Sequence, residues 1–134
     1  MLKLVLPWED QAGEAAAALG GDDPLGAPWA TVDFLEVECA NVLASVTRSG
    51  TIDNAYAVQS LGVITDLTLL RWPATSVLES ALELSCTHSI SVYDACYVAL
   101  AETLGVALLT ADKKLVRALK GTRHAAVPLG DFER

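Results

Sequence analysis

The stretch over residues 91–112 constrains the fold more than any other part of this chain. It predicts a helix over 91–104, stopped by Gly105, then a short strand over 106–109 and a second helix that opens near Asp112. The first helix is apolar nearly all round, which is typical of an element packed on more than one side. The stretch therefore predicts a buried helix that leads directly into a core strand.

Two aspartates lie in this stretch, and helix capping is the simplest explanation for each of them. Asp94 completes the capping-box pattern Ser-x-x-Asp that starts at Ser91, and Asp112 is a good N-cap for a helix over 113–119. Each cap contributes about 1 kcal/mol to helix stability. A carboxylate beside a buried framework also needs a partner, so a functional role remains the alternative for both residues.

The remaining elements alternate between short apolar strands and helices, which indicates a parallel sheet covered by helices. We expect a single domain over residues 1–134, a three-layer α/β/α sandwich. The expected elements are a short helix over 9–19, a strand over 29–32, a helix over 34–47 with Asp33 as N-cap and Gly50 as stop, one or two helices over 51–70, a helix from Thr75 or Ser76 to about Thr87, and a late strand over 125–129.

Composition indicates a soluble, cytoplasmic protein. No apolar run approaches the roughly 20 residues that a membrane span needs, and the apolar start is too short for an export signal. The three cysteines are odd in number and lack metal-ligand spacing, so we expect reduced thiols. We expect both histidines, His88 and His124, at the surface.

A third acid changes the interpretation of the two aspartates. Glu38 flanks the apolar stripe of the helix over 34–47 and starts a polar ribbon that continues through Asn41 and Ser45. An exposed glutamate at the margin of the stripe is the alternative. Helix N-termini and the ends of parallel strands meet at one sheet edge, so Glu38 and the two aspartates can meet there. Three carboxylates brought together repel one another unless they are protonated or joined by a cation, and oxygen ligands suit Mg²⁺ or Mn²⁺.

The charge distribution allows a nucleic-acid partner despite the net charge of −8. Five of the nine basic residues lie in one stretch that begins after Asp112: Lys113, Lys114, Arg117, Lys120 and Arg123. A solvated helix face and a phosphate-contacting face explain this stretch equally well. If this helix face contacts RNA, the candidate RNA-binding residues are Lys113, Lys114 and Arg117.

Three segments, in this order, resemble the PIN-domain family and within it the VapC-type toxin ribonucleases of bacterial toxin–antitoxin pairs. They are Ala27-Pro28 leading to Glu38-Cys39-Ala40-Asn41-Val42-Leu43, Ser91-Val92-Tyr93-Asp94-Ala95 with Ala99-Leu100-Ala101, and Leu108-Leu109-Thr110-Ala111-Asp112.

The resemblance implies hydrolysis of RNA phosphodiester bonds by water activated on Mg²⁺ or Mn²⁺. Glu38, Asp94 and Asp112 match three acidic positions of the family, Thr110 is a supporting hydroxyl, and Asn41 is a second supporting residue. The resemblance also implies a cognate antitoxin and a homodimer.

The start of the chain departs from the family pattern, which opens with a strand that ends in an aspartate. The segment over 1–7 resembles the family's first helix instead, or it is a strand over 2–6 that takes the place of the expected one. We expect the codons before Met1 to encode an apolar run ending in aspartate, and the chain as written to bind metal weakly and to cleave RNA poorly or not at all. A stop codon or unrelated sequence there would favour a truncated remnant.

Two other functions remain open. A non-catalytic module of the same fold would bind an antitoxin or a second copy of itself without holding metal. A phosphoacceptor domain also groups acids at the carboxyl edge of a parallel sheet. The latter needs a lysine at a late junction between strand and loop, whereas Lys113 and Lys114 begin a helix.

Overall fold

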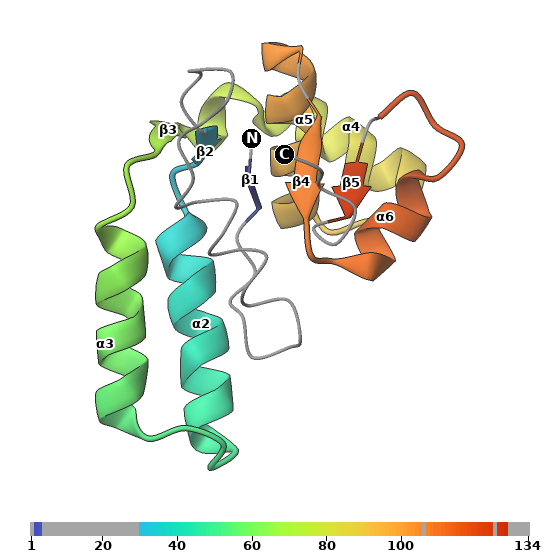
Figure 1. Cartoon of the computed structure of the whole chain (residues 1–134). Coiled ribbons are helices and arrows are strands. Elements are labelled where there is room, and N and C mark those ends of the chain that lie inside the picture. The colour runs from blue at the N-terminus through green and yellow to red at the C-terminus, as the bar shows by residue number, and fades with distance from the viewer. Residues whose placement is uncertain (1, 4–29, 106, 125, 129–134) are drawn as a thin grey trace.

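The computed structural model describes residues 2–3, 30–105, 107–124 and 126–128. Five short strands pair in parallel throughout this part of the chain (Figure 1). Strands β1 (Leu2–Lys3), β4 (Leu108–Thr110) and β5 (Ala126–Pro128) form one sheet in the order β1-β4-β5. Strands β2 (Ala30–Val32) and β3 (Leu70–Trp72) form a second pair. The α/β class predicted from the sequence is confirmed.

The described helices are α2 (Leu35–Arg48), α3 (Asn54–Thr65), α4 (Leu78–His88), α5 (Val92–Leu104) and α6 (Lys113–Leu119), with a 3-10 turn, η1 (Ala74–Ser76), before α4. Helices α2 and α3 lie side by side as a hairpin (Figure 1). None of the described helices is both long and apolar enough to cross a bilayer.

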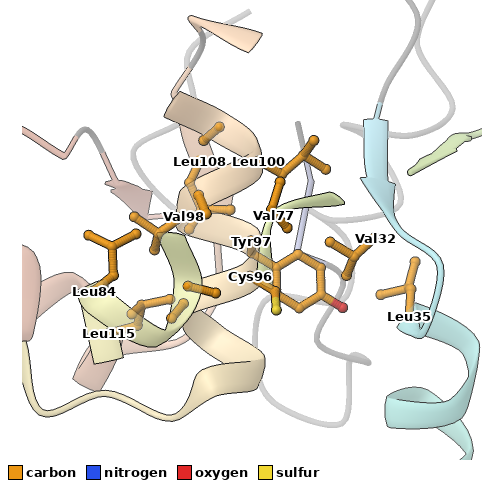
Figure 2. Close-up of a cluster of buried hydrophobic side chains, with 14 of the residues drawn as sticks. Val32, Leu35, Val77, Leu84, Cys96, Tyr97, Val98, Leu100, Leu108 and Leu115 are labelled. Atoms are coloured by element: carbon orange, nitrogen blue, oxygen red, sulfur yellow. The ribbon is translucent and has the colours of Figure 1, made fainter. Parts of the chain in front are cut away.

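Helix α5 is the centre of the core because it contacts β2, β4 and α4. Its residues 95–101 are all buried, as expected for a helix that is apolar nearly all round. The Ser91 hydroxyl accepts a hydrogen bond from the Asp94 N–H, and Gly105 ends the helix in the left-handed conformation with φ of 66°. Figure 2 shows side chains of α5 between residues of β4 and α6 on one side and residues of β2 and α2 on the other.

Several expected boundaries were wrong. Phe34, not Asp33, takes the N-cap position of α2, and the Asp33 side chain instead accepts a hydrogen bond from the Ala74 N–H at 3.0 Å. The helical prediction over 51–70 ends at Thr65, and β3 follows where no strand was expected. Neither Thr75 nor Ser76 caps α4, because both lie within η1. 

The segment at the start is a strand at Leu2–Lys3, so the helical alternative is wrong for these two residues. Leu2 pairs in register with Leu109, and Lys3 pairs with Thr110. The strand alternative is thus confirmed at these two positions. The helix expected over 9–19, the rest of the segment over 1–7 and Ala27-Pro28 lie outside the described residues.

Candidate active site

Glu38, Asp94 and Asp112 come from three elements that meet at one edge of the fold. Glu38 lies in the first turn of α2, which follows β2, and Asp112 follows β4. Asp94 lies in the first turn of α5, and since α5 turns back through Gly105 into β4, its start lies at the end where β4 finishes. All three side chains are partly exposed. That these three carboxylates form one site at the carboxyl edge stays a prediction.

Glu38 is held by a buried tyrosine that sequence analysis missed. The Tyr97 hydroxyl donates a hydrogen bond of 2.5 Å to Glu38 Oε2, a length typical of hydroxyl donors to a charged carboxylate. Tyr97 is fully buried, and Figure 2 shows its ring in the core with the hydroxyl directed towards Val32 and Leu35. Burial, and then the bond to Glu38, raise the pKa of Tyr97 far above its usual value, so Tyr97 remains a donor.

Two cysteine thiols share the surroundings of Glu38. Burial, followed by the negative charges of Glu38 and Glu36, raises the pKa of Cys39 to about 12. Burial, with the charge of Glu38 next, also raises the pKa of Cys96. Both thiols are therefore neutral at ordinary pH, and neither acts as a nucleophile or thiolate ligand. Cys39, Cys86 and Cys96 are reduced thiols, as expected.

Asp112 has the capping role that the sequence predicted. Its Oδ1 accepts hydrogen bonds from the backbone N–H groups of Lys114, at 2.9 Å, and Leu115, at 3.1 Å. The Asp112 N–H in turn donates to Thr110 Oγ1 at 3.0 Å. Thr110 is buried, so the hydroxyl predicted as a supporting group fixes the backbone from which Asp112 projects.

The other predicted site residues are exposed and lie close in the sequence to Glu38 or Asp112. Asn41 is exposed one turn beyond Glu38 on α2, so the polar ribbon faces solvent there. Lys113, Lys114 and Arg117 are exposed on α6, whose N-cap is Asp112. The basic face therefore starts directly beside one of the three acids.

The three carboxylates suit a hard divalent cation in chemistry, because Mg²⁺ and Mn²⁺ prefer oxygen ligands. Within residues 30–105, 107–124 and 126–128, however, no three histidine, cysteine, aspartate or glutamate side chains lie close enough together to hold a metal ion. The described residues thus supply donors of the right kind at one edge of the fold, without gathering three of them around one point.

The expectation of two surface histidines was wrong. His124 is only 9% exposed, and its Nδ1 lies 2.7 Å from Glu102 Oε1. The ring of His88 packs edge-on against that of His124 with centroids 5.1 Å apart, and Arg123 also pairs with Glu102. Glu102, Arg123 and His124 line a pocket of about 320 Å³ beside the C-terminal part of α5, whereas Asp94 lies at the other end of this helix.

Comparison with known proteins identifies the family of this chain. The PIN domain model matches residues 3–120. Ribonuclease VapC3 of Pyrobaculum aerophilum is 37% identical over 87 residues, which cover 63% of this chain and 66% of that protein. Ribonuclease VapC3 of Mycobacterium tuberculosis is 34% identical over 83 residues, covering 62% of this chain and 59% of that protein.

A solved structure is also similar. The crystal structure of PAE2754 from Pyrobaculum aerophilum superposes with a TM-score of 0.57 and 28% sequence identity, over 72% of this chain and 64% of that chain. The chain spans about two thirds or less of the length of these relatives.

Proposed function

Because this chain belongs to the PIN-domain family, we propose that it is a ribonuclease of the VapC type that hydrolyses RNA at the edge formed by Glu38, Asp94 and Asp112. The proposal is supported by the positions of these three acids, in the first turns of α2 and α5 and at the N-cap of α6 directly after β4. The names of the relatives, Ribonuclease VapC3 in two organisms, support the choice of RNA as substrate.

We propose Mg²⁺ or Mn²⁺ as the cofactor and the three carboxylates as the groups that hold it. Such an ion lowers the pKa of water and neutralises charge on phosphoryl oxygens. Tyr97 orients Glu38, and Thr110 fixes the backbone at Asp112. Lys113, Lys114 and Arg117 would contact RNA phosphates, because their exposed side chains follow Asp112 on α6.

We further propose that the protein pairs with a cognate antitoxin and forms a homodimer, as the resemblance to VapC-type toxins implies. These partnerships would be tested by co-expression with the product of a small adjacent gene and by measuring the molar mass in solution.

A non-catalytic binding module is the second candidate function. It is favoured by one observation, that no three potential metal-binding side chains are gathered in the described part of the chain. Tight binding to an antitoxin, combined with no binding of Mn²⁺, would support this second function over the first.

RNA cleavage with and without a chelator tests the proposal. Incubation with total bacterial RNA should give weak cleavage that requires Mg²⁺ or Mn²⁺ and is lost in Asp94→Asn. Asp53→Asn is the matched control, since Asp53 is an exposed aspartate at the N-cap of α3 and should leave cleavage unchanged. Cleavage that survives both the chelator and Asp94→Asn would contradict the metal-dependent mechanism.

A further inference from the structure

We infer that Tyr97 is a positioning residue that sets the orientation of the Glu38 carboxylate before any cation or RNA binds. The inference rests on the proposed function, because it gives Tyr97 a role in the same acidic site. The observation behind it is the 2.5 Å hydrogen bond between the Tyr97 hydroxyl and Glu38 Oε2, which joins residues 59 positions apart in the sequence.

The Tyr97 ring is itself held rigidly. Tyr97 is 0% exposed, and Phe34 packs edge-on against its ring with centroids 5.5 Å apart. Phe34 occupies the N-cap position of α2, one turn before Glu38. The core therefore fixes the Tyr97 hydroxyl, which is the donor, while the Glu38 carboxylate, which is the acceptor, projects from α2. The position of the carboxylate thus follows from the contacts of Tyr97, on α5, with Phe34 and Glu38 at the start of α2.

This bond matters because glutamate has a long, rotamer-rich side chain. Holding it in one orientation costs conformational entropy, and a free glutamate has to lose that entropy when it binds a ligand. In this chain the core has already fixed the Glu38 carboxylate through Oε2. Losing the hydroxyl should therefore weaken cation binding by about three- to tenfold, which is the effect of leaving one such side chain to be ordered on binding.

Tyr97→Phe removes the hydroxyl and keeps the ring. We expect this variant to bind Mn²⁺ about three- to tenfold more weakly by calorimetry. We also expect kcat for RNA cleavage to fall while KM for RNA stays unchanged. Tyr93→Phe is the matched control, since Tyr93 lies on the same helix and also packs edge-on against Phe34, but is 63% exposed. The control should match the parent chain within about twofold in Mn²⁺ affinity and kcat.

A double-mutant cycle separates positioning of Glu38 from a general role in packing. In a Glu38→Ala background, Tyr97→Phe should have no further effect on Mn²⁺ affinity, because the carboxylate that accepts the hydrogen bond is already gone. An equal loss of affinity in both backgrounds would overturn the inference, and so would a Tyr97→Phe variant that matches the parent chain in Mn²⁺ affinity and kcat. If the parent chain itself neither binds Mn²⁺ nor cleaves RNA, the proposed function fails as well.

Discussion

Asp112 has two separable roles, and replacement by asparagine or by alanine tests each of them. Its Oδ1 accepts hydrogen bonds from the N–H groups of Lys114 and Leu115, so the side chain caps α6. Its charge is the part that the proposed site requires. Asparagine keeps the acceptor oxygen and removes the charge, whereas alanine removes both.

The expected stability changes follow from the capping geometry. Losing an N-cap typically costs about 1 kcal/mol, so Asp112→Ala should lower the free energy of unfolding by that amount. For a domain of this size, the melting temperature should fall by about 4 °C. Asparagine caps helices about as well as aspartate, so Asp112→Asn should stay within about 0.5 kcal/mol of the parent chain. Urea unfolding followed by circular dichroism measures both changes.

The expected activity changes follow a different pattern. Both variants should lose RNA cleavage by roughly 100-fold or more, since each lacks a charge that the site requires. Asp53→Ala is the matched control, because Asp53 caps α3 through a hydrogen bond of 2.7 Å from the Tyr56 N–H. It should lose about 1 kcal/mol of stability and keep its cleavage activity. Folded Asp112→Asn with full cleavage activity would refute the functional role, and equal stability of the asparagine and alanine variants would refute the cap.

Two further predictions concern the core. Leu100 is fully buried, so Leu100→Ala should lower the free energy of unfolding, measured in urea, by about 3 kcal/mol. Leu82 is 56% exposed, so the control variant Leu82→Ala should stay within about 0.5 kcal/mol of the parent chain. Equal losses in the two variants would contradict the burial of Leu100. Folding raises the pKa of Cys39 from 9.0 to about 12, so as the pH rises the unfolded chain loses the thiol proton before the folded chain does. The free energy of unfolding should therefore fall as the pH rises above 9, by up to about 1.4 kcal/mol per pH unit. Unfolding curves measured across that pH range should show that the stability of Cys39→Ala depends less on pH than that of the parent chain. An equal pH dependence in the two chains would contradict the raised pKa of Cys39.

Sequence patterns predicted the features that depend on nearby residues. Ser91 and Gly105 bound α5 as expected, and Asp112 caps α6, because capping joins groups only two or three positions apart. The motif order predicts that the three acids share one edge of the α/β fold, since parallel strands share a carboxyl edge, and this placement stays a prediction.

Features that depend on distant partners were missed. All three residues of β3 are exposed, and its pairing with β2 joins segments about 40 residues apart in the sequence. His124 is buried against Glu102, which no local pattern around a single histidine reveals. The bond between Tyr97 and Glu38 was likewise missed, although Tyr97 lies one turn after Asp94 and its polar end on an apolar helix was an available signal.

Titration of the metal-free chain with Mn²⁺ tests most directly whether the three acids form one site. The parent chain should bind a single Mn²⁺ ion, and Glu38→Gln, Asp94→Asn and Asp112→Asn should each weaken that binding by roughly tenfold or more. A parent chain that binds no Mn²⁺, or three variants that bind it as the parent chain does, would contradict a common site for these acids.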